Sequence, residues 1–229
     1  MEKFIETRFN CNIDGSLHTY LHKRLILNIL KYIWEHVETK IENYTIFDDK
    51  KEGVCQYWYR NNHLRIRCVY SNGKRKGDFK SWYDSGQLWE EYAYLNDKLE
   101  GEYKCYYENG QFDVLCVYLN GIRHGNCKCW YRNGQLLSHR TYLNGQIEGE
   151  YKSWYENGQL FVQCFYANGK LEGEYKSWYE NGQLFVQCFY ANGKLEGKAE
   201  SWYENGYLRR QCTYLNGELK DEVKHSSVL

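Results

Sequence analysis

The chain has 229 residues, and its 30 basic and 30 acidic side chains give a formal net charge of zero. A balanced charge excludes the strong positive field that draws proteins to nucleic acids or anionic membranes. Aromatic residues make up 18% of the chain, which argues against disorder. The chain contains no proline, and this favours a structure built mainly of paired strands.

The N-terminal leader, residues 1–52, carries an amphipathic pattern in its second half. Its first ten residues lack the apolar core of a signal peptide, and no segment reaches the roughly 18 apolar residues of a membrane span. We therefore expect a cytoplasmic protein. Ser16 is a suitable N-cap, and a helix is predicted over 17–42. This helix is expected to cap the region that follows; the alternative is that it binds a partner. Its apolar stripe consists of Ile26, Leu30, Ile33, Val37 and Ile41.

Residues 53–220 consist of contiguous copies of a 24-residue unit. The segment 149–172 recurs letter for letter at 173–196, and the other copies are looser. A unit stacked on copies of itself buries surface only against its neighbours, so the repetition predicts an elongated array. The seven copies are 53–76, 77–100, 101–124, 125–148, 149–172, 173–196 and 197–220.

Each copy carries two turn signals, at its ninth and tenth and at its twentieth and twenty-first positions. In the fifth copy these are Asn157-Gly158 and Asn168-Gly169. Asn-Gly between alternating segments is typical of a two-residue type I′ hairpin loop. Each copy is therefore predicted to form two antiparallel strands. The expected fold is mainly β: an elongated single-sheet antiparallel meander of seven hairpin repeats, about fourteen strands, with an N-terminal capping helix.

Two-residue loops would also fix which side chains share a face of the sheet. Tyr155 would then face Leu160, on a face that repeats tyrosine at the seventh and eighteenth positions and is predicted to pack. The opposite face, here called the aromatic face, carries the sixth position, which is tryptophan in all copies but one. It is predicted to meet solvent or partners, or to stack as structural ribs with Phe161, Phe165, Phe185 and Phe189. Its candidate interaction residues are Trp58, Trp82, Tyr106, Trp130, Trp154, Phe161, Trp178, Phe185 and Trp202.

Glycines and the C-terminal tail predict how the sheet bends and ends. A glycine opens every copy, and in a strand it permits a sharp bend or a close backbone approach. A long open sheet must curl, so we expect bends at these positions. The tail, residues 221–229, begins with a charged segment that resembles the first strand of another copy. It is expected to protect the last edge of the sheet with charge.

Several of the ten cysteines occupy one repeat position. Equivalent positions in adjacent hairpins lie about 9.6 Å apart, beyond the ~7 Å Cα limit for a disulfide. These cysteines are expected to be buried thiols in a reducing compartment. Cys127 and Cys129 form a C-x-C segment, but no second pair completes a zinc site, so ordinary core cysteines are preferred. The recurrent cysteines are Cys68, Cys116, Cys164, Cys188 and Cys212.

A lysine recurs at the fourth position of the copies and raises the alternative of binding to phosphoinositides or anionic membranes. Acidic residues two positions earlier lie on the same face and oppose that charge, so a solvated face of mixed charge is preferred. The lysines are Lys80, Lys104, Lys128, Lys152 and Lys176, and the acids are Asp78, Glu102, Glu150 and Glu174.

The segments WYENGQL, YANGKLEG and YLNGQIEGEYKSWY resemble MORN repeats, in the variant also found in bacterial antitoxin-like proteins. The resemblance covers residues 53–220 and implies an elongated antiparallel β array without enzymatic activity. Family members are associated with scaffolding, membrane-proximal organisation and self-association. Such arrays also occur in giant DNA viruses, which implies a viral protein of the host cytoplasm or the virion. Turn signals depart from the pattern at Asn61-Asn62, Ser85-Gly86 and Asn96-Asp97, so the early copies are expected to pair less regularly.

No group of residues predicts catalysis. The seven histidines show no regular grouping, and no glycine-rich loop has the setting of a phosphate site. We expect no enzyme activity, no cofactor, no metal and no nucleic-acid partner. The leading hypothesis is a scaffold that binds an unidentified protein, or forms a homodimer, through the aromatic face. The alternatives are a peripheral membrane or phosphoinositide-binding module and an antitoxin-like neutraliser of a protein toxin.

Overall fold

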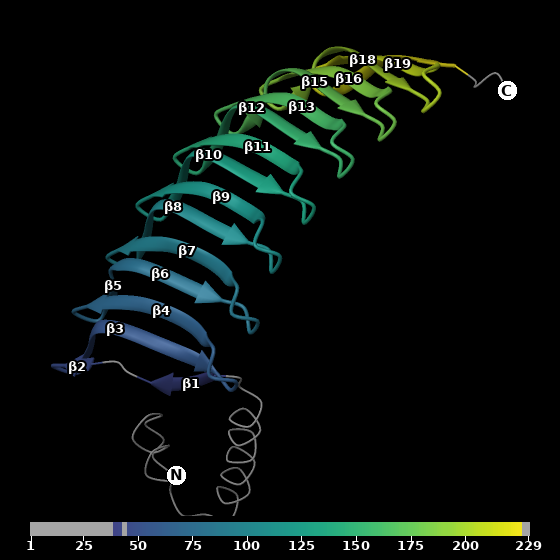
Figure 1. Cartoon of the computed structure of the whole chain (residues 1–229). Helices are drawn as coiled ribbons and strands as arrows, with labels where there is room; N and C mark the ends of the chain where they lie inside the picture. Colours follow the sequence, from purple (N-terminus) through teal and green to yellow (C-terminus); the bar gives the residue numbers. More distant parts are fainter. Residues whose placement is uncertain (1–38, 43–44, 226–229) are drawn as a thin grey trace, which may run out of the picture. The chain divides into compact units, whose positions relative to one another are not determined.

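The computed structural model describes residues 39–42 and 45–225. The chain divides into two compact units, 1–40 and 41–229, and the second contains the repeats. Its secondary structure consists of antiparallel strands, which confirms the mainly β repeat fold; the described residues contain no helix. Figure 1 shows the hairpins following one another in chain order. The strands are β1 (Thr39–Glu42), β2 (Thr45–Phe47), β3 (Lys50–Tyr59), β4 (Leu64–Ser71), β5 (Lys74–Arg75), β6 (Gly77–Trp82), β7 (Leu88–Leu95), β8 (Lys98–Tyr106), β9 (Phe112–Leu119), β10 (Ile122–Trp130), β11 (Leu136–Leu143), β12 (Gln146–Trp154), β13 (Leu160–Ala167), β14 (Lys170–Leu171), β15 (Gly173–Trp178), β16 (Leu184–Ala191), β17 (Lys194–Leu195), β18 (Gly197–Trp202), β19 (Leu208–Leu215) and β20 (Glu218–Lys224).

The predicted helix over 17–42 is wrong at its C-terminal end. Residues 39–42 form β1, where Thr39 and Ile41 are β-branched and therefore suit a strand. The remainder of the predicted helix, with its apolar stripe through Val37, lies outside the described residues. The leader also contains a hairpin that the sequence analysis missed: β2 and β3 pair across Asp48 and Asp49, both with positive φ. Aspartate tolerates this conformation, so the turn forms without Asn-Gly.

The second turn of each copy is the predicted two-residue loop. In the fifth copy Ala167 pairs with Lys170, and the central residues have φ angles of 52° at Asn168 and 74° at Gly169. Positive φ at both positions is the signature of a type I′ turn. Copy two has Asn-Asp in place of Asn-Gly at this turn, but it forms the same loop. Asn96 and Asp97 adopt the same conformation, with φ angles of 50° and 64°.

The first turn differs from the prediction. Tyr155 donates its N–H to the carbonyl of Gln159 at 2.8 Å and accepts from the N–H of Gly158 at 2.9 Å. The loop therefore contains three residues, and only its glycine has a positive φ, 85°. This is a type I turn followed by a left-handed residue, the common three-residue hairpin loop. The register shifts between Ser153 and Trp154, so Tyr155 does not face Leu160 as expected.

Beyond that shift, the predicted faces are confirmed. Ser153 pairs with Val162 and Tyr151 with Cys164, in the register that the sequence analysis expected. On the predicted packing face of the fifth copy, Ser153, Val162 and Cys164 are buried and the other side chains are half-buried, whereas Phe165 on the other face is exposed. The core consists largely of small side chains, namely Cys55, Cys68, Ser81, Cys105, Cys116, Cys127, Ser138, Ser153, Cys164, Ser177, Cys188 and Cys212, with Tyr142 and Val162.

Glycine at the first position of each copy produces the expected bend. Gly149 has a φ of 80°, and the pairing of β11 with β12 is irregular between His139 and Thr141, opposite this glycine. In β5/β6, β14/β15 and β17/β18 the same bend divides one predicted strand into two. A Cβ at Gly149 would meet no atom within 4 Å, so the glycine serves backbone conformation and not close approach.

Hydrogen bonds from side chains tie each copy to the next. The hydroxyl of the seventh-position tyrosine donates to the sixth-position carbonyl of the following copy, as in Tyr155 to Trp178 at 2.8 Å. Asn157 donates its side-chain N–H to the carbonyl of Glu180 at 3.0 Å. The carboxylate of Glu172 accepts the backbone N–H of Asn192 at 2.7 Å. The tyrosine bond recurs from Tyr59, Tyr83, Tyr107, Tyr131 and Tyr179.

Cys116 forms a disulfide with Cys127, so the expectation that it is a free thiol is wrong. The spacing argument compared equivalent positions of adjacent copies, but these cysteines occupy different positions and face each other across β9 and β10. Their Cα atoms lie 4.1 Å apart. Cys55 and Cys68 also face each other, across β3 and β4, and remain free.

The last described strand of the array is β20. β20 pairs with β19 in antiparallel register, and Tyr214 faces Leu219. Most β20 side chains are exposed, and Arg210 of β19 forms an ion pair with Glu222 of β20. A charged outermost strand discourages pairing with a further chain.

Candidate interaction surface

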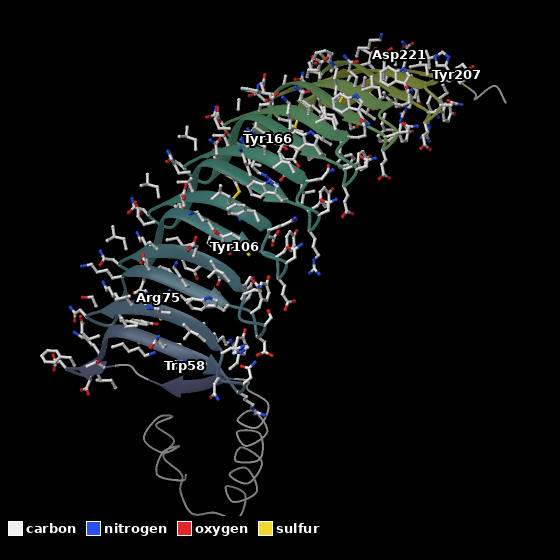
Figure 2. The ribbon with its side chains drawn as sticks, viewed as in Figure 1. Trp58, Arg75, Tyr106, Tyr166, Tyr207 and Asp221 are labelled. Atoms are coloured by element: carbon white, nitrogen blue, oxygen red, sulfur yellow. A yellow bond between two sulfur atoms is a disulfide. The ribbon has the colours of Figure 1, made fainter. Side chains whose placement is uncertain are left out.

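Tryptophans of the aromatic face are half-buried. Each of the seven sixth-position residues is neither buried nor fully exposed. The carbonyls of the last six, from Trp82 to Trp202, accept the tyrosine bonds described above. Figure 2 shows Trp58 and Tyr106 on hairpins of the first and third copies. The structure thus places all seven predicted residues of this row along the array, without bringing them into one cluster. They are Trp58, Trp82, Tyr106, Trp130, Trp154, Trp178 and Trp202.

Thirteenth-position phenylalanines contact the tyrosines of the first turn. The ring centroids of Tyr155 and Phe161 lie 4.8 Å apart, and those of Tyr179 and Phe185 lie 4.9 Å apart. The three-residue loop makes these contacts, because it changes the register beside the turn. A two-residue loop would have put each pair on opposite faces. Phe161 and Phe185 are therefore tied to the turn, although the Phe161 ring stays exposed.

Phe165 and Phe189, at the seventeenth position, are exposed to 47% and 43%. Unlike Phe161 and Phe185, they have no aromatic partner among the described residues. The interpretation of these two rings as stacked ribs is therefore wrong. The sequence held a signal for them, because only the two identical copies have an aromatic residue at this position. The other copies have Val69, Ala93, Val117, Thr141 and Thr213.

An open hollow of 530 Å³ lies beside Phe165, between β13 and β15. The sequence analysis did not predict it, because it depends on the bend at Gly173, where the strand leaves its regular path. Glu172 donates its backbone N–H to the carbonyl of Phe165 at 2.9 Å and so fixes this side of the hollow. Its lining residues are Glu150, Gln163, Cys164, Phe165, Glu172, Gly173, Glu174 and Lys176.

Four of the five fourth-position lysines, all but Lys128, form ion pairs with acidic neighbours among the described residues. Lys152 lies 2.7 Å from Glu150, and Lys176 lies 2.8 Å from Glu174. Lys80 pairs with Glu91 of the opposite strand, at 3.0 Å. These pairs fit the prediction of a face with mixed charge. Lys104 also has two acidic neighbours, Glu102 and Glu91.

Ionisation on this surface follows from those contacts. The hydrogen bond from Lys152 is the main cause that lowers the pKa of Glu150, and Lys176 does the same for Glu174. Burial raises the pKa of Cys164 to about 11, so this thiol at the base of the hollow is neutral at physiological pH. Within residues 39–42 and 45–225, no group of three His, Cys, Asp or Glu side chains is placed to hold a metal ion.

A second exposed apolar row follows the second turns of copies two to four. Leu95, Leu119 and Leu143 occupy equivalent positions, and Ile122 pairs with Leu119. All four side chains are exposed. The sequence analysis missed this row because it considered strand faces and not turn edges. A search of the described residues for helices long and apolar enough to cross a membrane found none.

This geometry defines a mainly β repeat protein whose hairpins are joined in sequence by backbone and side-chain hydrogen bonds. The model of the MORN repeat variant family matches residues 51–72, 75–96, 99–120, 123–144, 147–168, 171–192 and 195–216. The chain belongs to this family. The matched segments recur with the same 24-residue period as the copies above and begin two residues earlier.

Comparisons with other proteins add little to this assignment. No curated protein matches the chain. Among solved structures, the crystal structure of TarM is similar over 64% of this chain, with 12% identity and a TM-score of 0.30. A mutant of S. aureus TarM in complex with fondaparinux, alpha-GlcNAc-glycerol and UDP gives 12% identity and a TM-score of 0.31. The chain spans 26% of the length of each TarM chain, and these likenesses carry no functional argument.

Proposed function

We propose that the array is a non-enzymatic scaffold that binds another protein, or a second copy of itself, through the aromatic face. The observation that carries this proposal is the recurrence of exposed rings on one face, among them Phe161, Phe165 and Phe189. Aromatic side chains are enriched at protein interfaces, where burying each ring removes a large apolar area from water. Repeats of this family are generally modules that bind proteins or membranes, which supports the same class of function.

Self-association is tested first, by sedimentation velocity over a hundredfold range of protein concentration. A homodimer predicts a mass that rises with concentration, and the double variant Phe161→Ser, Phe185→Ser should remain monomeric. The control Leu143→Ser removes an exposed apolar side chain from the second-turn row and should behave as the wild type. A wild-type protein that stays monomeric removes the homodimer from the proposal and leaves the heterologous partner.

Heterologous binding is tested with the same variants as bait in extracts of the native source. The proposal expects a specific protein that the wild type and Leu143→Ser retain and the double phenylalanine variant loses. Equal retention by all three would show that the aromatic face is not the binding surface. A captured nuclease or other toxin would make the protein an antitoxin-like neutraliser, which is one form of the same function.

Membrane association is the second candidate, and the exposed row Leu95, Leu119, Ile122 and Leu143 favours it. Aliphatic turn residues next to Lys98 and Arg123 have the composition of an interfacial anchor. The ion pairs of the fourth-position lysines oppose it, because they cancel much of the attraction to anionic lipid. Sedimentation with anionic vesicles at low salt decides the question, and Leu119→Ser should then reduce the bound fraction.

A cytoplasmic location is part of the proposal. Seven described cysteines are free thiols, including the facing pair Cys55 and Cys68, and this favours a reducing compartment. The Cys116–Cys127 disulfide is the opposing observation. Alkylation of the native protein before lysis, followed by mass spectrometry, would show which of these cysteines are reduced where the protein resides.

A further inference from the structure

The hollow beside Phe165 combines carboxylates with an exposed aromatic ring. Glu150 faces Phe165 across β12 and β13, and Glu172 and Glu174 flank it on the other side. An acidic rim around an apolar wall is complementary to a side chain that has an apolar stem and a cationic head. Lysine and arginine are the two residues with this construction.

Each rim carboxylate has a spare oxygen. Oε1 of Glu150 accepts from Lys152 and Gln163, and Oε1 of Glu174 accepts from Lys176 and Gln187. Glu172 accepts the N–H of Asn192 through Oε2 alone. The second oxygen of each carboxylate therefore makes no hydrogen bond within the described chain and can accept one from a partner.

The Phe165 ring supplies the other half of the site. It is exposed to 47% and stacks on no aromatic ring of the described chain. A cation over the face of an aromatic ring is attracted by the ring quadrupole, and a neighbouring carboxylate adds to that attraction. Lys152 and Lys176 offset the charges of Glu150 and Glu174, so the net negative charge of the rim comes from Glu172, whose carboxylate accepts only the Asn192 N–H within the described chain.

We propose that this hollow binds a lysine or arginine side chain of a partner protein, with the stem on Phe165 and the cation among the three carboxylates. The inference rests on the proposed function and names the chemistry of the partner at the same face. Bidentate contact with carboxylates favours arginine over lysine.

Part of this construction recurs one copy later. Glu174 faces Phe189 across β15 and β16, and Glu196 precedes the bend at Gly197. After the bend the charges are exchanged, because Lys198 and Glu200 occupy the positions that Glu174 and Lys176 hold in the first site. Lys198 is engaged by Glu200 at 2.8 Å, as Lys176 is by Glu174. Glu174 thus lies at both sites. Copy four lacks the construction, because Asn126 faces Thr141 at the corresponding positions.

The spacing of the two sites restricts the conformation of the partner. Equivalent positions of adjacent copies are two strands apart, about 9.6 Å. Residues three apart in a polyproline II segment lie on the same side and are separated by about 9.3 Å. Same-side residues of a β-strand are about 6.6 Å apart and do not match. The partner segment is therefore extended, with basic residues at every third position.

The test uses the full chain and two labelled peptides of equal composition in fluorescence anisotropy. One is a proline-rich peptide with arginine at every third residue, and the other has the same arginines grouped together. The spaced peptide should bind at least tenfold more tightly, and its affinity should fall as salt rises. Equal affinities, or no binding of either peptide at millimolar concentration, would overturn the proposal.

Two variants locate the binding. Glu174→Gln removes a carboxylate from both sites and should lower the affinity for the spaced peptide at least tenfold. Phe189→Ser should lower this affinity severalfold. Asp78→Asn is the matched control, because Asp78 occupies the same repeat position but faces Ala93, and its affinity should stay within twofold of the wild type. If Asp78→Asn lowers the affinity for the spaced peptide as much as Glu174→Gln does, the effect comes from general surface charge and the proposed site is refuted.

Failure of this inference is separable from failure of the proposed function. Suppose the peptides do not bind while the Phe161→Ser, Phe185→Ser variant still loses its partner or its self-association. Binding through the aromatic face is then supported, and recognition of a basic segment is refuted. Tighter binding of a helical peptide with arginine at every seventh residue would also refute the extended partner. Circular dichroism of each variant confirms that the fold is retained.

Discussion

Single tyrosine hydroxyls join the hairpins at the residue scale. The seventh-position tyrosine occurs in every copy, and its hydroxyl reaches the next copy at the sixth-position carbonyl. Sequence comparison within the chain detected that this position is constant but assigned it to packing. The structure gives it a polar role as well, because the three-residue turn carries the ring to the edge where the next hairpin begins.

Replacing one of these tyrosines by phenylalanine should weaken the array without changing its shape. Tyr155→Phe removes a 2.8 Å hydrogen bond to a half-buried carbonyl, so the free energy of unfolding should fall by about 1 kcal/mol. Tyr203→Phe is the matched control, because its bond to the His225 carbonyl is long, 3.4 Å, and exposed. Urea denaturation measures both. A control loss as large as that of Tyr155→Phe would contradict this role.

The same hydroxyls make stability depend on alkaline pH. Burial, aided by a hydrogen bond with Asp113, raises the pKa of Tyr107 from its ordinary value of 10.0 to about 12. A raised pKa in the folded state means that folding favours the neutral hydroxyl. The contribution is complete below pH 10 and is lost as pH rises through about 12. Urea denaturation across this range should show falling stability, and Tyr107→Phe should have a smaller slope; an unchanged slope would reject the assignment.

At the element scale, the two turns of each copy show how far local sequence determines structure. Both carry Asn-Gly, yet only the second forms the two-residue loop. In the first turn, Asn157 accepts the N–H of Gln159 at 2.9 Å and donates to the next copy. These bonds hold the asparagine with negative φ, and they depend on a neighbouring hairpin that a local dipeptide rule does not include.

The first turn requires one residue in the left-handed conformation, so alanine and asparagine at this position should differ in their effect on stability. Gly110 has a φ of 83°, and an added Cβ would meet no atom within 4 Å. Gly110→Ala should therefore lower the free energy of unfolding by about 1 kcal/mol through backbone strain alone. Gly110→Asn should lower it less, because Asn62 occupies the equivalent position in copy one with a φ of 67°. Thermal denaturation that ranks asparagine below alanine would contradict this account.

Strand identity and faces were predictable because alternation is a property of the chain itself. Ser153, Val162 and Cys164 are buried as their pattern predicted. The Cys116–Cys127 disulfide was not predictable in this way, because it depends on which residue of one hairpin faces which residue of the next. The hollow at Phe165 could not be predicted from the sequence either, because it also depends on contacts between neighbouring hairpins. Its carboxylates come from two copies, and only the bend at Gly173 brings them to one ring.

On the scale of the whole molecule, stability is a sum over copies and the contacts between neighbours. Tyrosine, asparagine and glutamate bonds all run between adjacent copies, as in Tyr155 to Trp178 and Glu172 to Asn192. A repeat array of this kind has no single centre on which the rest depends. The two identical copies make this property directly testable, because removing one leaves every junction unchanged in sequence.

Deletion of residues 173–196 joins Glu172 to Gly197, and the sequence around this new junction is the same as that around Glu196 and Gly197. The shortened chain should fold and keep the bonding pattern of the remaining copies. Its urea m-value should fall by about one-seventh, because m scales with the surface exposed on unfolding. Deletion of 101–124 is the control of equal length; it removes Cys116 and its disulfide, and it joins copies of unlike sequence. The control should therefore be the less stable chain, and equal loss in both deletions would show that junction identity does not govern the array.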